Sequence, residues 1–417
     1  MPSVHTGAVV PSRSSGLRAV LLATVIAGVV GYAIQGVVAG AVVPEDYLVF
    51  SIFWSTLYLL IAALSGLQQE ATRATHPVDT RRAAGRLVPV GTGVALLVGA
   101  IVLGSAPLWS GAVFVRATWT LTGLLGLGAA AYSGLALLAG VFFGLRLWRG
   151  VAAMTIVDAV LRLLLVCGAL VAGGGPVLLA AAVVLPFPLT LVLLWLLERR
   201  RVVGAYSFDV RPPAFAWNAV RAVGGSISMG LLTSGYPLII GATSRNEPES
   251  LVGALVFVIT LTRAPLVVPA LALQSYVTVL FRDQRGGTRR TLVGVLAAVV
   301  TFGAMLALIA YLVEPWLLER IWGQTYVVSA TTAAGILLTA SLTAALCISG
   351  PATLAAKRHG TYLVGWAVAA GVSVLALLLP LDLETRVLVS MAVGPLLGIL
   401  VHLVGLPARP TGTHGHA

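Results

Sequence analysis

The sequence predicts an all-α protein that crosses a membrane about twelve times, and three observations support this prediction. Of the 417 residues, 59% are hydrophobic and only 10% are charged, and the mean hydropathy is +1.00. Soluble globular domains carry about 25% charged residues. The hydrophobic residues form runs of about 20, the length of a helix that spans a hydrocarbon core of about 30 Å. Lys and Arg gather in alternate loops between these runs, as the positive-inside rule describes.

Twelve hydrophobic runs are long enough to span a bilayer. They cover residues 19–43, 47–67, 87–107, 119–143, 151–173, 177–197, 217–241, 251–280, 292–313, 328–350, 361–380 and 387–405. Lipid offers no hydrogen-bonding partner to open backbone groups, so a spanning segment must be a helix or part of a closed β-barrel. Because the runs lack the apolar–polar alternation of barrel strands, we expect helices.

The distribution of basic residues predicts the orientation. Of the 26 Lys and Arg residues, 20 lie in one set of alternate loops, 4 lie in the other set and 2 lie inside helices. The first set includes the loops with Arg73, Arg146, Arg199 and Lys357, whereas the second set is acidic. Cytoplasmic loops carry the excess of Lys and Arg. We therefore expect a multi-pass protein of the cell inner (plasma) membrane with both termini in the cytoplasm.

An internal repeat divides the chain into two halves. A Gly-Tyr pair followed by a Pro-Glu pair occurs twice, 204 residues apart: Gly31-Tyr32 with Pro44-Glu45, and Gly235-Tyr236 with Pro248-Glu249. Gln69 and Gln274 follow at an offset of 205. Six expected helices separate the copies, so the halves are expected to be parallel repeats, a plan that places transporter substrates between the halves. Chance recurrence of these common dipeptides is the alternative explanation.

The repeat predicts the following domain organisation. Residues 19–200 form an N-terminal six-helix bundle and residues 217–405 form a C-terminal one, joined by a cytoplasmic linker at 201–216. The polar ends, 1–18 and 406–417, are expected to be disordered cytoplasmic segments.

Arg263 is the most informative single residue. It lies twelve residues into its expected helix, which places it about 18 Å from the membrane surface and near the midplane. A charge at that depth costs at least about 2.5–3.5 kcal/mol and should face the protein interior or a wet cavity. One interpretation is an anion contact in a central cavity. The other is a buried arginine that a neighbouring helix neutralises.

Asp158 and Arg162 are the other charges well inside an expected helix. They lie at i and i+4, so they share a face and can pair. A self-neutralised structural pair is one interpretation. If Arg162 faces a cavity instead, it is a candidate for substrate binding and Asp158 for ion coupling.

Four polar residues complete the candidate cavity set. Gln35 and Gln274 can hydrogen-bond a sugar or phosphate, and Tyr32 and Tyr236 are the tyrosines of the repeat. Each of the glutamines is as well explained by a hydrogen bond to a neighbouring helix.

Several classes of function find no support. The net charge of +12 comes from loop clusters and not from one basic face, so we expect no nucleic acid partner. Cys167 and Cys347 lie in apolar runs and the six histidines are scattered, so we expect no metal and no cofactor. Because no nucleotide-binding loop or catalytic arrangement stands out, we expect neither an ATPase nor another enzyme.

Three segments resemble a known transporter group. They are Ala27-Gly28-Val29-Val30-Gly31-Tyr32, Leu67-Gln68-Gln69-Glu70-Ala71-Thr72-Arg73 and Trp322-Gly323-Gln324-Thr325-Tyr326. With the twelve-helix plan and the midmembrane arginine, they make the chain similar to the multidrug/oligosaccharidyl-lipid/polysaccharide (MOP) flippase superfamily. The most similar branch is the polysaccharide or O-antigen exporters, in an actinobacterial type.

This resemblance implies a MATE-like pair of bundles that work by alternating access. It implies that an undecaprenyl-pyrophosphate-linked oligosaccharide or polysaccharide precursor moves from the inner to the outer leaflet. Cavity arginines would meet the pyrophosphate, a role that Arg263 matches by position, and a lateral gate would admit the lipid tail. Glycan polymerases or glycosyltransferases would then be partners, in addition to the bilayer itself.

Three other functions stay open. An ion-coupled small-molecule or drug antiporter would use a cavity acid, for which Asp158 is the candidate. A major-facilitator transporter also has two six-helix halves, but Asp79-Thr80-Arg81-Arg82 only faintly matches its cytoplasmic turn. A polyprenyl-phosphate-dependent glycosyltransferase would place an acidic pair in the first outer loop, where Glu45-Asp46 lies.

Overall fold

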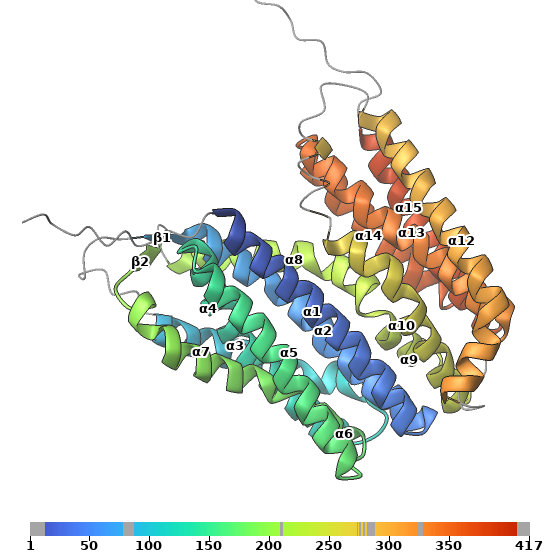
Figure 1. Cartoon of the computed structure of the whole chain (residues 1–417), viewed down its shortest axis with the longest axis horizontal. Helices are drawn as coiled ribbons and strands as arrows, with labels where there is room; N and C mark the ends of the chain where they lie inside the picture. Colours follow the sequence, from blue (N-terminus) through green and yellow to red (C-terminus); the bar gives the residue numbers. More distant parts are fainter. Residues whose placement is uncertain are drawn as a thin grey trace, which may run out of the picture.

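The structure is a computed structural model that describes residues 13–77, 87–208, 212–272, 274, 277, 280–281, 288–322 and 328–406. Most of the ends predicted to be disordered, and the motif that begins at Trp322 after its first residue, lie outside the described residues. The helices in Figure 1 are α1 (Arg13–Ala41), α2 (Pro44–Ala74), α3 (Leu87–Val113), α4 (Thr118–Gly144), α5 (Trp148–Val171), α6 (Pro176–Val184), α7 (Pro186–Val202), α8 (Pro212–Thr233), α9 (Tyr236–Thr243), α10 (Glu249–Ala272), α12 (Thr288–Trp322), α13 (Ala330–Ala355), α14 (His359–Ala376) and α15 (Leu383–Gly405).

These helices confirm the predicted all-α membrane fold. Among the described residues, eleven helical spans are long and apolar enough to cross a membrane. One of them, Pro176–Val202, combines α6 and α7, which a turn at Leu185 separates. The run at 217–241, which the sequence predicts to be one helix, is instead divided between α8 and α9.

The break between α8 and α9 has a clear local cause. The backbone N–H groups of Ser234 and Gly235 both donate to the carbonyl of Gly230, at 2.8 and 3.0 Å, which ends α8. Pro237 occupies the first turn of α9, where a residue without an N–H costs nothing. The chain therefore loses helical continuity at this point.

The helices form two bundles, which Figure 1 shows side by side. The first bundle contains α1 to α7 and the second contains α10 and α12 to α15, while α8 packs against both α2 and α14 and α9 packs against both α2 and α10. Helix α2 is the main element at the contact, because it packs against α8, α9 and α10. Asn218 of α8 donates to the buried Glu70 carboxylate of α2 at 3.0 Å. A Cβ at Gly230 would lie 2.7 Å from that of Ala62, so α8 also approaches α2 very closely.

The two ends of the bundles differ in charge. We call the end with Arg73, Arg146, Arg199 and Lys357 the basic end, and the end with Asp46 and the other loop acids the acidic end. In Figure 1 the bundles approach each other at the acidic end and diverge toward the basic end, where α1 begins.

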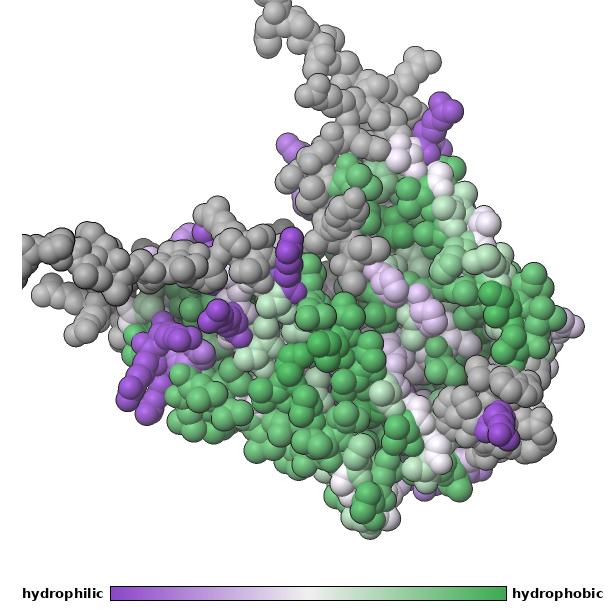
Figure 2. Space-filling model, viewed as in Figure 1, coloured by the Kyte–Doolittle hydropathy of each residue, from purple (hydrophilic) through white to green (hydrophobic). Residues whose placement is uncertain are grey.

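The surface between the two ends is hydrophobic. Leu108 is 88% exposed and Val171 is 90% exposed, and Figure 2 shows hydrophobic residues over most of the visible face of both bundles. Water would strongly disfavour this much exposed apolar area. The face between the ends is therefore the surface that lipid covers.

A two-stranded antiparallel sheet at the basic end is an addition to the all-α prediction. It pairs β1 (Thr75–Pro77), which follows α2, with β2 (Tyr206–Phe208), which follows α7. Tyr206 is fully buried, its ring packs edge-on against Phe208, and Phe208 packs against Phe215 of α8. The sheet therefore attaches the chain between α7 and α8 to the first bundle.

The predicted orientation can be tested by labelling single cysteines in whole cells. In a chain without Cys167 and Cys347, Ala172→Cys lies exposed at the acidic end and Gly360→Cys at the basic end. We expect a membrane-impermeant maleimide to label Ala172→Cys in intact cells and Gly360→Cys only after permeabilisation, because the positive-inside rule predicts that the basic end faces the cytoplasm. Labelling of Gly360→Cys in intact cells would show that the orientation is reversed.

Candidate functional site

A cavity of about 190 Å³ lies between the two bundles. Residues of α1, α2, α8, α9 and α10, and of the break between α8 and α9, line it. Much of its wall is polar: the side chains of Tyr32, Gln35, Ser55, Tyr58, Thr233, Ser234, Thr260 and Arg263. This position is the one that the repeat predicts for a substrate site.

Arg263 is the charged residue of this central cavity. Its side chain is 6% exposed, and Nη2 donates to the backbone carbonyl of Leu232 at 2.6 Å. In a continuous helix that carbonyl would accept from the N–H of Tyr236, but α8 ends before Tyr236. The guanidinium also lies 5.2 Å from the centre of the Tyr236 ring, a cation–π contact. The arginine thus provides the donor that the helix break removes.

Arg263 nevertheless keeps most of its hydrogen-bonding capacity. A guanidinium has five N–H donors, and the Leu232 carbonyl is the one acceptor that Arg263 meets among the described residues. None of the ion pairs between described residues includes it. The neighbouring helix therefore supplies a carbonyl dipole and not a full negative charge, so the cavity contains an uncompensated cation.

The other candidate residues of the central site separate into three groups. Tyr32 and Gln35 line the cavity with Arg263, and Gln35 Oε1 accepts a hydrogen bond from Tyr47 at 3.2 Å. Tyr236 is buried behind Arg263 and its hydroxyl bonds to Ser390. The Gln274 amide contacts Met229 of α8 at 3.9 Å and is not among the described residues that line the cavity.

A second cavity, of about 500 Å³, lies inside the first bundle and contains Asp158 and Arg162. Arg162 Nη2 donates to both oxygens of Asp158, at 2.8 and 2.6 Å, and Nη1 donates to the Tyr58 hydroxyl at 2.5 Å. Its guanidinium lies 4.9 Å from the centre of the Phe187 ring, and Nε approaches the Val183 carbonyl at 3.4 Å. Asp158 and Arg162 therefore form the self-neutralised pair that their spacing allows.

Helix α1 separates the two cavities. Ala27, Gly28 and Gly31 line both of them, as does Tyr58 of α2. A Cβ at Gly28 would lie 3.8 Å from Val268, and one at Gly31 would lie 3.9 Å from Trp54, which are ordinary contact distances. Close helix packing therefore does not require these glycines. Because they have no side chains, little more than the backbone of α1 separates the two cavities at Gly28 and Gly31.

An ion pair and a hydrogen bond join the bundles at the acidic end. Arg116, in the loop between α3 and α4, contacts Asp46 of α2 at 3.3 Å and also Glu249 at the start of α10. Arg245, before α10, donates to the Gly111 carbonyl of α3 at 2.7 Å. Two arginines thus link the first bundle to the second at this end.

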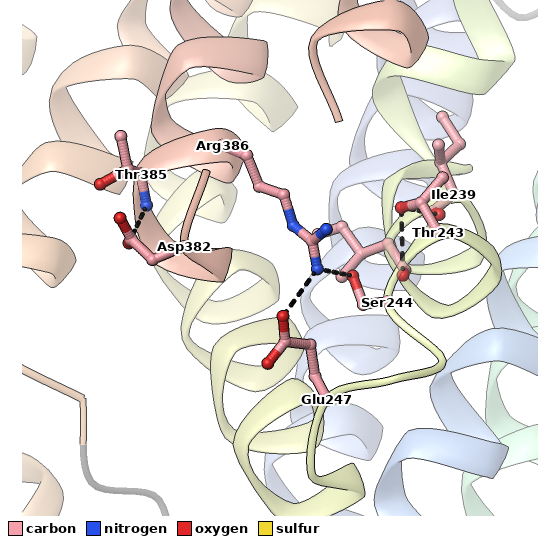
Figure 3. A network of polar contacts seen from close by, with 8 residues as sticks. Ile239, Thr243, Ser244, Glu247, Asp382, Thr385 and Arg386 are labelled. Atoms are coloured by element: carbon pink, nitrogen blue, oxygen red, sulfur yellow. Dashed lines mark hydrogen bonds and ion pairs between the residues drawn. The ribbon is translucent and has the colours of Figure 1, made fainter. Parts of the chain in front are cut away.

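A further network at the acidic end braces the second bundle. Figure 3 shows Arg386 of α15 reaching toward the loop after α9, where it contacts Glu247 at 3.1 Å and the Ser244 hydroxyl at 3.2 Å. Asp382 accepts from the Thr385 N–H at 2.9 Å and so caps α15, a bond that lowers the pKa of the Asp382 carboxyl. Arg386 of the second bundle therefore holds the loop with Glu247, and Arg116 of the first bundle holds the start of α10 at Glu249.

Relatives of this chain occur in mycobacteria. It is 33% identical over 400 residues to the Mycobacterium tuberculosis protein named Uncharacterized protein Rv3630, covering 94% of this chain and 92% of that protein. It is 31% identical over 411 residues to Uncharacterized protein Rv1510 of the same organism, covering 96% and 93%. The chain belongs to this family of mycobacterial proteins. No family model matches this member of the family.

Solved structures with a similar fold are transporters. An inward-facing multidrug resistance MATE family transporter of the MOP superfamily matches with a TM-score of 0.67 and 14% identity, covering 89% of this chain and 92% of that one. The lipid II flippase MurJ in an inward closed conformation matches with a TM-score of 0.64 and 12% identity, covering 92% and 86%. This chain therefore has the fold of these transporters, as the sequence resemblance implies.

The structure adds functional candidates that the sequence pattern does not indicate. Tyr58 connects the two cavities through its bond to Arg162, yet in the sequence it is one aromatic residue in an apolar run. Arg116 is different, because it is one of only four basic residues in the acidic set of loops. A basic residue in a loop of the acidic set departs from the positive-inside rule, and this departure indicates a specific partner.

The paired state of Asp158 and Arg162 makes a prediction about stability. Asp158→Asn should lower the unfolding temperature in detergent, because it leaves the Arg162 guanidinium buried without a countercharge, at a cost of about 3–5 kcal/mol. The double variant Asp158→Asn with Arg162→Gln should recover much of this loss. An unchanged unfolding temperature for Asp158→Asn would show that the pair is not structural.

Proposed function

We propose that this protein is a transporter that moves a lipid-linked oligosaccharide or polysaccharide precursor from the inner to the outer leaflet by alternating access. The observation that carries the proposal is Arg263. It is a buried cation in the cavity between the bundles, without a carboxylate partner among the described residues. A charge at such depth is costly, so it is retained where it serves a function.

The chemistry of the central cavity favours an anion that carries hydroxyl groups. A guanidinium matches phosphate oxygens in a bidentate geometry and is the side chain best suited to that contact. Gln35, Ser55 and Thr260 add donors and acceptors for sugar hydroxyls. The pyrophosphate link of an undecaprenyl-pyrophosphate glycan combines both features. The cavity, at about 190 Å³, has room for the pyrophosphate link but not for the attached glycan. Binding of the whole head group would therefore need a more open state.

The shape of the molecule supports alternating access. The bundles are linked by Arg116 and Arg245 at the acidic end and diverge toward the basic end. With the basic end in the cytoplasm, this arrangement is one that would admit a substrate from the inner leaflet. The surfaces of both bundles are apolar, so a lipid tail can stay in the bilayer while the head group enters.

The proposal includes the cellular setting. The chain lies in the inner (plasma) membrane with both termini cytoplasmic, next to the glycan polymerases or glycosyltransferases that handle the same lipid-linked substrate. Two contacts weigh against the other functions. The bidentate bond to Arg162 occupies the carboxylate that an ion-coupled antiporter would use, and Arg116 occupies the Asp46 carboxylate that a glycosyltransferase would use.

Substitution of Arg263 tests the proposed substrate contact. In proteoliposomes with a fluorescent undecaprenyl-pyrophosphate oligosaccharide, Arg263→Ala should reduce the rate of movement between leaflets at least tenfold, because a phosphate contact worth more than about 1.4 kcal/mol is lost. Arg263→Lys, which keeps the charge but not the bidentate geometry, should be intermediate. Arg290→Gln, which removes one exposed charge from the start of α12, is the matched control.

Folding has to be measured on the same samples, because Arg263 also bonds the Leu232 carbonyl. Thermal unfolding in detergent separates a loss of transport from a loss of structure. If Arg263→Ala folds normally and moves the lipid at the rate of the unaltered protein, Arg263 does not bind the substrate and the proposal fails.

The arginine at the acidic end makes a second prediction, about conformation. Arg116→Gln removes the contacts with Asp46 and Glu249, each worth about 0–1 kcal/mol at an exposed site. Because only the contact with Glu249 joins the two bundles, the population with an open acidic end should rise by up to about fivefold. Spin labels at Val115 and Ser250 lie on opposite sides of the contact. Double electron–electron resonance should show a shift of the label-to-label distances to larger values.

The control for this experiment is Arg386→Gln. Its partners, Glu247 and Ser244, lie on the loop between α9 and α10, so the loss of these contacts should leave the distance between the bundles unchanged. A distance distribution for Arg116→Gln that matches that of the unaltered protein would show that these ion pairs do not hold the acidic end closed.

A further inference from the structure

An apolar groove lies on the outside of the first bundle, apart from both cavities. Helices α3 and α7 form its sides and α4 forms its floor, and its volume is about 430 Å³. Its rim is open to the surroundings, since Leu96 is 70% exposed and Val192 is 57% exposed. We call it the α3–α7 groove. Because the surrounding surface is the one that lipid covers, the groove is open to the bilayer.

Small residues create the groove. Ala130 and Gly134 of α4 form the floor, and Gly91 and Ala95 of α3 form one side. No atom lies within 4 Å of the position that a Cβ on Gly91 would occupy, so the space beside it is empty of protein. On α4 the lining runs from Leu127 to Leu138, a rise of about 16 Å along the helix. That length is about half of a hydrocarbon core of about 30 Å, and the α3 lining, from Leu87 to Leu96, lies in the half of α3 nearest the basic end.

The end of the groove nearest the basic end is positively charged. The lining residues of α7 include Pro188, Leu191 and Trp195. At the spacing of three to four residues that marks one helix face, the next residue is Arg199. Arg199 and Arg200 are exposed and form no ion pair with a described residue, whereas the nearby Glu198 pairs with Arg201 at 3.1 Å. Trp195 lies between the apolar lining and this charge, as aromatic residues do at membrane interfaces.

We propose that the α3–α7 groove binds an anionic phospholipid of the leaflet at the basic end. One acyl chain fills the groove along α4, and the phosphate meets Arg199 and Arg200. A free phosphate lacks the chain, and a zwitterionic lipid carries no net charge for the two arginines. The site uses a different face of α4 from the cavity that holds Arg162, which includes Leu135 and Ala139. The proposal is therefore independent of the transported substrate.

Native mass spectrometry of the purified protein provides the test. We would add phosphatidylglycerol or phosphatidylcholine with identical acyl chains and measure the retained lipid. The unaltered protein should retain phosphatidylglycerol at least fivefold more strongly. Arg199→Gln should remove about fivefold of this preference, as expected for one basic residue near an anionic head group.

Gly91→Leu adds a side chain to the groove where its Cβ has no neighbouring atom within 4 Å, and it should reduce phosphatidylglycerol retention at least fivefold. Gly93→Leu is the matched control. That residue is also in α3 and has no neighbour within 4 Å of its Cβ position, but it is not among the described residues that line the groove. Ala95→Leu is a second groove-filling variant for the case in which Gly91→Leu does not fold, and thermal unfolding without added lipid reports folding for each variant.

Three results would overturn the proposal. They are equal retention of the two lipids by the unaltered protein, retention by folded groove-filling variants that equals the unaltered value, and a loss in Gly93→Leu as large as that in Gly91→Leu. Loss of substrate movement in Arg263→Ala would instead test the proposed function, because Arg263 lines the central cavity and not the α3–α7 groove.

Discussion

The hydrogen bond between Arg263 and the Leu232 carbonyl is the contact on which the central site depends. In lipid, a backbone carbonyl at the end of a helix needs a donor, and water is not there to supply it. The Gly235-Tyr236-Pro237 sequence ends α8 inside the membrane and creates this requirement. Arg263 meets it from α10 at 2.6 Å, and in doing so a guanidinium is fixed in the wall of the cavity. The interaction that permits the break therefore also positions the charge.

The two arginines inside the membrane solve the same problem with different results. Arg162 also lies beside a broken helix, where it approaches the Val183 carbonyl ahead of Pro186, but Asp158 neutralises it through two short bonds. Arg263 has an aromatic ring and a carbonyl in place of a carboxylate. Each arrangement tolerates a buried cation, but only the second leaves attraction for an incoming anion. The net charge of the two cavities thus differs by the one carboxylate of Asp158.

Particular residues show what the sequence could predict. Hydropathy depends on local composition, so it predicted the spans well, while the family resemblance predicted the MATE-like fold. The i, i+4 spacing of Asp158 and Arg162 was sufficient to predict their bond as one alternative. The break at Gly235 was missed because a hydropathy run stays continuous across it, although Pro237 was visible. The bonds from Arg162 to Tyr58, 104 residues apart, and from Arg116 to Glu249, 133 residues apart, depend on packing that no local pattern contains.

The small sheet between β1 and β2 affects where the chain can bend. It attaches the segment after α7 to the first bundle, and α8 then follows α2 through the Asn218–Glu70 bond and the close approach of Gly230 to Ala62. These contacts join β2 and α8 to the first bundle as far as the break that ends α8. The break at Ser234 and Gly235 comes directly after these contacts, and Ser234 lines the cavity. Any change in the angle between the bundles would then act directly on the backbone that Arg263 holds.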